Sequence, residues 1–188
     1  LFYPPDPASL DTCTLGGNVA TNAGGPVALK YGVTGNFVLG LEAVLADGRV
    51  IETGRRQPKS VAGYDLTSLL VGSEGTLGVI TRIRLGLRAC PSEVVTALLP
   101  FGSVNDAAQT VPYARAAGLE PRAMELFDTT SLQRACRDPD YPGDDSWASL
   151  LLVEFDGGPG EGEAALARFL EGLPAAPLEV RRADSLAE

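Results

Sequence analysis

Residues 15–26 read LGGNVATNAGGP, a stretch with two glycine pairs and no charged side chain. Glycine lets a backbone adopt positive φ and lets a ligand approach the main chain closely. Consecutive exposed N–H groups can then bind an anion, and the Asn and Thr side chains add neutral donors and acceptors. The stretch therefore indicates a ligand-binding loop or a glycine-rich surface turn, and we expect residues 1–36 to be mostly loop.

The neighbourhood of this stretch is free of carboxylates. Residues 12–41 contain no Asp or Glu, whereas 24 such residues in a chain of 188 predict about four in a segment of that length. The chain as a whole has a net charge of −9. An acidic protein that keeps carboxylates out of one segment is consistent with an anionic ligand there, and its charge argues against a nucleic-acid partner.

The remaining composition is that of a soluble globular protein, 45% hydrophobic and 21% charged. No segment reads as a signal peptide or a transmembrane helix. The three cysteines, Cys13, Cys90 and Cys136, are far apart, and the chain has no histidine, so we expect no metal site. Reduced thiols favour a cytoplasmic location.

The first half of the chain also carries β-strand patterns. Residues 38–54 form two apolar runs joined by Asp47-Gly48, which predicts a hairpin. A short helix is expected after Asp65, its N-cap. A second glycine cluster at 72–78 then precedes a half-buried strand that begins at Val79 and keeps its arginines on a solvated face.

The pattern changes after Cys90-Pro91 to strands alternating with helices. We expect strands at VVTALLPF, AMELF and SLLLVEFDG, with a fourth beginning at LEV (178–180). We expect helices after Ser103, kinked by Pro112 and stopped at Gly118, after Asp128, and over EGEAALARFLEGL. This order predicts an α+β fold of ferredoxin-like type, and a domain boundary near residue 91.

Three longer segments together are more specific than either glycine cluster. YPPDPASLDTCTLGGNVATNAGGP, KYGVTGNFVLG and SVAGYDLTSLLVGSEGTLGVIT resemble the FAD-linked oxidases of the vanillyl-alcohol-oxidase type, which have a PCMH-type FAD-binding domain. Within that family the resemblance is closest to the FAD subunit of glycolate oxidase and to FAD-dependent D-lactate dehydrogenases. It covers residues 1–88 densely, while AMELFD and LLLVEFDG resemble the start of the family's cap domain. It implies the later part of the FAD-binding domain at 1–90 and the first part of the cap (substrate) domain at 91–188.

The resemblance also implies which residues bind FAD, mainly through backbone amides. Those implied at the pyrophosphate, ribose and flavin linker are Pro5, Asp6, Thr12, Cys13, Thr14, Gly16 and Gly17. Those implied beside the ribityl chain and isoalloxazine ring are Asn18, Ala20, Thr21, Gly24, Gly25, Tyr31 and Gly32. Those implied on the far side are Glu74, Gly75, Gly78, Val79 and Ile80, with backbone groups of the last two near the adenine.

Several of these residues have a purely structural alternative. Cys13 can be a packed small side chain, Asp6 the cap of a turn, and Glu74 the partner of an arginine. Tyr31 can be an ordinary half-buried aromatic residue. Glu125 and Asp128 resemble a family motif, but packing at a strand end explains them equally well.

By resemblance, the intact protein is an FAD-dependent oxidoreductase that oxidises a small D-2-hydroxy acid, such as glycolate or D-lactate, by hydride transfer to flavin. The family's Arg-Gly-Gly-Gly type loop and its His-x-Gly-Asp-Gly-Asn type segment are not in the chain, which starts at Leu1 within a Pro-rich turn. We therefore expect a fragment with no catalytic or metal-binding side chain.

Three alternatives remain open at this stage. The same fold can act on another alcohol, such as a sugar, an aldonolactone or an ether-lipid precursor. The chain can also be a noncatalytic FAD-binding subunit, or an inactive piece. Sister subunits and a peripheral membrane location of the intact enzyme are both compatible with the sequence, which does not identify the electron acceptor.

Overall fold

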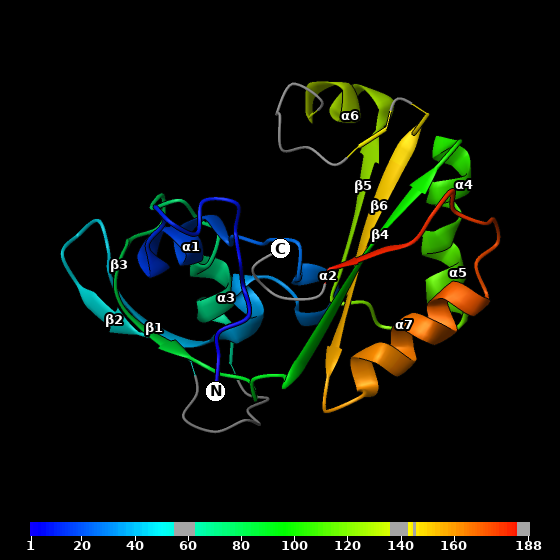
Figure 1. Ribbon diagram of the computed structural model, residues 1–188. Coiled ribbons are helices and arrows are strands. Elements are labelled where there is room, and N and C mark those ends of the chain that lie inside the picture. The colour runs from blue at the N-terminus through cyan, green and yellow to red at the C-terminus, as the bar shows by residue number, and fades with distance from the viewer. Residues whose placement is uncertain (55–62, 136–142, 145, 184–188) are drawn as a thin grey trace. The chain divides into compact units, whose positions relative to one another are not determined.

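The computed structural model describes residues 1–54, 63–135, 143–144 and 146–183. The chain forms two compact units, Leu1–Cys90 and Pro91–Glu188. Each unit has a sheet of its own (Figure 1), with strand order β2-β1-β3 in the first and β5-β6-β4-β7 in the second. The mixture of helices and antiparallel sheets confirms the predicted α+β class.

The first sheet contains the predicted hairpin, formed by β1 (Val38–Val44) and β2 (Val50–Glu52). In the turn, the N–H of Gly48 donates to the carbonyl of Leu45 at 2.9 Å, and Gly48 has φ +83°. A positive φ at this position is the reason for the glycine. The N–H of Arg49 donates to Asp47 and lowers the pKa of that carboxyl.

The third strand, β3 (Val79–Leu85), pairs antiparallel with β1. The helices α1 (Leu15–Thr21) and α3 (Leu66–Leu70) pack on one face of this sheet, with Val19, Leu41, Ala43 and Leu70 as the buried core. Asp65 accepts a hydrogen bond from Ser68 N at 3.0 Å and so caps α3, which confirms that prediction.

The expectation of loop over residues 1–36 was wrong for part of the segment. Leu15–Thr21, including both glycines of the first pair, is helical, and α2 (Ala28–Tyr31) and a 3-10 turn, η1 (Thr34–Phe37), follow. Each glycine disfavours a helix by about 1 kcal/mol. Tertiary contacts offset this cost, because Thr14 caps the helix and Val19 is fully buried against the sheet.

The second sheet has the strand order of a ferredoxin-like fold. The nine-residue strands β4 (Glu93–Phe101) and β6 (Ser149–Gly157) pair along their whole length. β5 (Ala123–Asp128) pairs with the other edge of β6, and β7 (Arg181–Ala183) with the other edge of β4. All three pairings are antiparallel, as in a ferredoxin-like fold, where each β-α-β unit leaves room for a strand of the other unit between its two strands.

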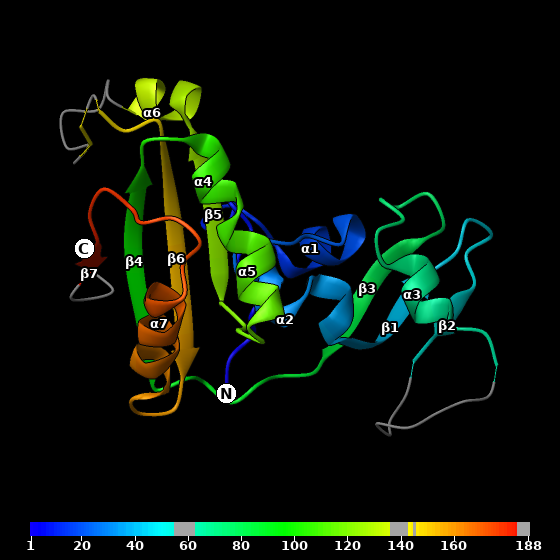
Figure 2. The same cartoon turned by 90° about the vertical axis from the view of Figure 1, so that its right-hand side faces the viewer.

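Helices α4 (Val104–Ala108), α5 (Thr110–Ala116) and α7 (Glu161–Glu171) cover one face of this sheet (Figure 2). The break between α4 and α5 confirms the effect expected of Pro112, whose ring would clash with the carbonyl of Ala108 in a continuous helix. Gly118, with φ +64°, ends α5 as predicted.

At the end of β5, Asp128 accepts a hydrogen bond from Ser131 N at 2.8 Å and caps α6 (Thr129–Ala135), as predicted. This bond is the main cause that lowers the pKa of the Asp128 carboxyl. The fourth strand begins at Arg181, three residues later than expected. Leu178 N donates to Pro100 O, but Pro100 has no N–H with which to return a hydrogen bond. The pairing of β4 with β7 therefore starts at Leu98 and Arg181.

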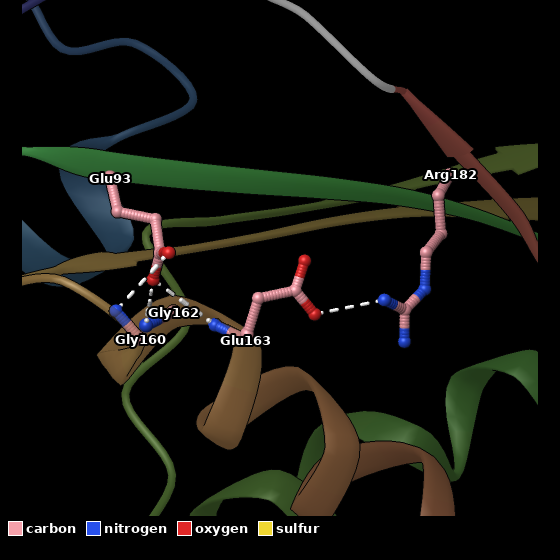
Figure 3. Close-up of polar contacts among 5 residues, drawn as sticks. All are labelled: Glu93, Gly160, Gly162, Glu163 and Arg182. Atoms are coloured by element: carbon pink, nitrogen blue, oxygen red, sulfur yellow. Dashed lines mark hydrogen bonds and ion pairs between the residues drawn. The ribbon is translucent and has the colours of Figure 1, made fainter.

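The N-terminus of α7 is capped by a side chain from β4 rather than by its own N-cap residue, Gly160. Glu93 accepts hydrogen bonds from the backbone N–H groups of Gly160, Gly162 and Glu163, at 3.2, 2.8 and 3.3 Å (Figure 3). Glu163 also pairs with Arg182 of β7 at 2.8 Å. Among the helices of the described residues, none has the length and apolar character needed to cross a membrane.

Candidate cofactor-binding site

The first glycine pair lies in the first turn of α1. Thr14 Oγ1 accepts a hydrogen bond from Gly17 N at 3.0 Å, and a turn at residues 9–13 leads into the helix. The side chains of Thr12 and Thr14 are exposed, and a Cβ built on Gly16 would meet no atom within 4 Å. The fold therefore does not require glycine at position 16, although its backbone is open to close approach.

The second glycine cluster contacts the other end of the same helix. Gly72 N donates to Val19 O at 3.0 Å, and Glu74 N donates to Ala20 O at 2.9 Å. Glu74 and Gly75 both have positive φ, 52° and 79°, and a Cβ on Gly75 would also lie in open space. The structure thus brings together two predicted segments that are about fifty residues apart in the sequence.

The loop between these contacts contains a buried hydroxyl with unused hydrogen-bonding capacity. Within the part of the chain that the structure describes, Ser73 Oγ is buried and has no hydrogen-bond partner. Such groups are uncommon in folded proteins, because an unmade hydrogen bond costs about 1–3 kcal/mol. Glu74 forms no ion pair with a described residue, so the structural alternative for Glu74 finds no support there.

The fold itself requires glycine at two other predicted positions. A Cβ on Gly25 would collide with the main chain and carboxylate of Asp6, and Asp6 Oδ1 accepts a hydrogen bond from Val27 N at 3.3 Å. Gly32 has φ +86° and no room for a Cβ beside Asn36. Asp6 therefore stabilises the 24–27 turn, whether or not it also contacts a ligand.

The side chains along α1 are mostly committed to contacts within the fold. Cys13 is a free thiol that donates to Leu10 O at 3.5 Å and accepts from Asn18 Nδ2 at 3.4 Å. Asn18 is buried, while Thr21 is exposed and donates to Gly17 O at 3.0 Å. These contacts agree with Cys13 as a packed side chain.

The remaining predicted residues lie at the edges of this region. Pro5 is buried, and Tyr31, at the end of α2, packs edge-on against Phe2 with ring centroids 5.6 Å apart. Gly78 and Val79 lead into β3, where Val79 is opposite Val44. Ile80 packs against the buried core of the first unit, so only its backbone is available to a ligand.

Two residues that are not among the predicted cofactor residues, Asn22 and Thr34, also shape the candidate site. Asn22 ends α1 with φ 51°, and its Oδ1 accepts a hydrogen bond from Gly35 N at 2.8 Å. Thr34 is fully buried and donates through both N and Oγ1 to Ala23 O. One available signal was the Asn itself, since Asn is the side chain that best tolerates this backbone conformation.

The first unit also has a cavity of about 260 Å³ lined by residues of β1, β2 and β3 and by Thr53. Its charged lining residues are Glu42, Glu52, Arg82 and Arg84. Arg82 and Glu42 form an ion pair at 3.6 Å. None of the predicted cofactor residues lines this cavity, so it is not the predicted site.

The chemistry around α1 suits an extended dinucleotide such as FAD. The open backbone at Gly16 and Gly75 has the space that a Cβ would fill. The hydroxyls of Thr12 and Thr14 are neutral donors and acceptors, and no carboxylate occurs over residues 12–41. Main-chain and hydroxyl donors can bind a pyrophosphate and a ribose without a compensating charged side chain.

Comparison with known families matches both units. Residues 1–54 match the family model described as "FAD binding domain". Residues 90–185, about half of the chain, match the one described as "FAD linked oxidases, C-terminal domain".

Individual relatives agree with these matches. The chain is 46% identical over 160 residues to glycolate oxidase subunit GlcD of Bacillus subtilis, covering 84% of this chain and 33% of that protein. It is 39% identical over 186 residues to a D-lactate dehydrogenase of Archaeoglobus fulgidus, covering 99% of this chain and 38% of that protein. The chain thus spans well under half of these relatives.

A solved structure of alkyldihydroxyacetonephosphate synthase has a similar fold. The two superpose with a TM-score of 0.76 at 22% sequence identity, over 95% of this chain and 36% of that protein. At this level of identity the likeness extends to the fold alone.

Proposed function

This chain belongs to the FAD-linked oxidases, and on that premise we propose that it is part of an FAD-dependent oxidoreductase that oxidises a small D-2-hydroxy acid, such as glycolate or D-lactate. The substrate class rests on the relatives named glycolate oxidase subunit and D-lactate dehydrogenase. The first unit supplies cofactor contacts, and the second unit is the start of the substrate domain.

The observation that carries the proposal is the meeting of the two glycine clusters on α1. Gly72 and Glu74 donate to the C-terminal end of α1, while the open backbone of Gly16 lies in its first turn. The backbone and hydroxyl groups at both ends of the helix would hold FAD. The flavin, when bound, supplies the two-electron redox chemistry that amino-acid side chains lack.

Flavin binding is the first test, and Gly16 is the best position at which to perturb it. Gly16→Val adds a side chain in open space, so the fold should be kept while the approach to the backbone is blocked. We expect FAD to bind at least about tenfold more weakly, as measured by quenching of FAD fluorescence on titration with the longest purified protein that contains this chain.

Gly102→Val is the matched control. Gly102 lies in the second unit and, like Gly16, has no atom within 4 Å of a built Cβ. Gly17 and Gly24 are poorer choices, because a Cβ on either would be 3.2 Å from Thr14 Oγ1 or Val33 Cγ1, and misfolding would confuse the result. Equal FAD affinity in the Gly16→Val and Gly102→Val variants would refute the placement of the cofactor.

The substrate class is tested separately, with the longest protein that contains this chain. Under anaerobic conditions we expect D-lactate or glycolate to bleach the flavin absorbance, and L-lactate not to. Bleaching by a sugar or an aldonolactone instead would keep the family and change the substrate. Bound flavin that none of these alcohols reduces would favour the second candidate, a noncatalytic FAD-binding subunit.

The name of the first relative, a glycolate oxidase subunit, favours assembly with sister subunits. We extend the proposal to such a complex, and size-exclusion chromatography of the protein with co-expressed neighbouring gene products tests it. We also propose a cytoplasmic location, with the intact enzyme peripheral to a membrane. The free thiols of Cys13 and Cys90 support only the reducing compartment. Fractionation of cells into cytosol and salt-washed membrane tests this location.

A further inference from the structure

We propose that Asn22 is a positioning residue that joins three separate segments of the FAD site, an inference that rests on the proposed function. It holds the end of α1, the second glycine cluster and the Thr34–Gly35 turn in one arrangement. Asn22 is not among the residues that the family resemblance implies. FAD affinity is therefore expected to depend on its side-chain carbonyl, even though that group is occupied inside the protein.

The first contact joins α1 to the turn that follows α2. Asn22 Oδ1 accepts the hydrogen bond from Gly35 N at 2.8 Å, across thirteen residues of sequence. Next to it, Thr34 N and Thr34 Oγ1 donate to Ala23 O at 2.9 and 2.8 Å. Residues 22–23 and 34–35 are thus held together by three hydrogen bonds, and the Gly24-Gly25 pair lies in the loop that these bonds close.

The second contact joins α1 to the second glycine cluster. A Cβ built on Gly72 would lie 3.3 Å from Asn22 Cβ, so the two residues are close neighbours in space. Gly72 N donates to Val19 O in the last turn of the same helix. Asn22 therefore lies at the end of α1 beside the second glycine cluster, where its conformation can influence how the two segments lie relative to each other.

The backbone of Asn22 explains why this residue type is needed. With φ 51° and ψ 50°, the residue is left-handed, and its N–H closes the end of α1 by donating to Asn18 O and Val19 O. Apart from glycine, Asn and Asp are the residues that adopt this conformation most readily. Glycine would fit the backbone but would lack the carbonyl that accepts from Gly35 N.

The orientation of the amide follows from its partner. Gly35 N can only donate, so the atom facing it is the oxygen of Asn22, and Nδ2 is the remaining polar atom of an exposed side chain. A clamp through Oδ1 and a direct contact through Nδ2 make different predictions for Asn22→Asp. Aspartate keeps the acceptor and the left-handed backbone but removes the amide donor.

The experiment compares Asn22→Gly, Asn22→Asp and the unsubstituted chain, with Asn105→Gly in the second unit as the matched control. FAD dissociation constants are measured by fluorescence quenching in about 0.5 M salt, where charge repulsion from the new carboxylate is screened. Exchange of the Gly35 amide is followed by NMR without FAD. We expect Asn22→Gly to weaken FAD binding about tenfold and to speed Gly35 exchange by a similar factor. Asn22→Asp should stay within about threefold on both measures.

Each other outcome overturns a defined part of the reasoning. Unchanged FAD affinity or unchanged Gly35 exchange in Asn22→Gly contradicts the positioning role. Equal weakening of FAD binding in Asn22→Gly and Asn22→Asp also contradicts it, since it indicates a direct contact through Nδ2. If the longest protein that contains this chain binds no FAD, the proposed function fails and this inference with it, whereas unchanged affinity of the variants in a protein that binds FAD refutes the inference alone.

Discussion

Removal of the Glu93 carboxylate should destabilise the second unit by an amount that the geometry at α7 predicts. Gly160, the N-cap residue of α7, has no side chain to accept from the first N–H groups of the helix. Glu93 accepts from two of these groups, Gly162 N and Glu163 N, and from the N–H of Gly160 itself, with the shortest bond, 2.8 Å, to Gly162 N (Figure 3). A hydrogen bond to a charged group contributes about 1.5–3 kcal/mol, and an N-cap contributes about 0.5–2 kcal/mol. Counting the 2.8 Å bond in full and the two longer ones as marginal, we expect Glu93→Ala to cost about 2–3 kcal/mol.

Two further variants separate the charge from the acceptor and from the surface ion pair. Glu93→Gln keeps one acceptor oxygen and should cost about 1 kcal/mol. Glu163→Gln breaks only the ion pair with Arg182, in which both side chains are about half exposed, and should cost at most about 0.5 kcal/mol. The expected order of free energy lost is therefore Glu93→Ala, then Glu93→Gln, then Glu163→Gln.

The assay is urea unfolding followed by the fluorescence of Trp147, the single tryptophan of the chain. Trp147 is buried against Leu132 and Leu150, so its emission reports on the second unit alone. A loss of 2–3 kcal/mol in a unit of this size lowers Tm by roughly 10–20 °C. Surface substitutions usually change the free energy of unfolding by no more than about 0.5 kcal/mol. If Glu93→Ala and Glu163→Gln lower it by amounts that agree within about 0.5 kcal/mol, the capping of α7 by Glu93 is refuted.

Three more predictions concern the same unit and the same fluorescence assay. A Gly→Ala change normally favours a helix, but Gly162→Ala should destabilise the second unit by about 1 kcal/mol. The new Cβ would lie 3.2 Å from Phe155 O and 3.0 Å from the carboxylate of Glu93. A gain in stability would contradict the close approach of α7 to the sheet. Phe169→Ala should cost about 3–5 kcal/mol, since the ring is fully buried and packs on Phe155 with centroids 5.7 Å apart; a loss below 1 kcal/mol would contradict that burial. The pKa of Asp128 is lower in the folded chain than its ordinary value of 3.8, because its carboxylate accepts the hydrogen bond from Ser131 N. The contribution of Asp128 to the free energy of unfolding is therefore fully present above pH 3.8 and is lost as the pH falls through the lower, folded-state pKa. Asp128→Asn keeps a capping group but does not titrate, and acid unfolding curves should show a smaller loss of stability below pH 3.8 than the unsubstituted chain; identical curves would contradict the cap.

Local chemistry was enough to predict most of the second unit. Its strands alternate with helices along the chain. Its helices α4 and α6 are capped by Ser103 and Asp128, and the break between α4 and α5 follows from Pro112. These signals work because caps and proline act within a few residues of themselves. These local signals did not predict the late start of β7, because it depends on Pro100, a residue of β4 that lacks an N–H.

The site in the first unit was predictable as a set of motifs but not as an arrangement. Leu15–Thr21 is helical because Val19 is buried against a sheet that forms later in the sequence, and no propensity rule contains that contact. The sequence also does not show which glycines have room for a side chain and which do not. Only the packed structure separates Gly25, which has no room for a Cβ beside Asp6, from Gly16, which has nothing near it.

The sequence by itself determined the family, the α+β class and the segments expected to meet FAD, because motif order and strand or helix periodicity are properties of the chain read along its length. The tertiary structure decided that the two glycine clusters meet on one short helix, and that Asn22 lies beside Gly72 and accepts a hydrogen bond from Gly35. Those contacts join residues up to about fifty positions apart, and they depend on how the sheet orients the elements packed on it. Nothing in the local sequence encodes that orientation, since a glycine carries no side chain to show which way it faces.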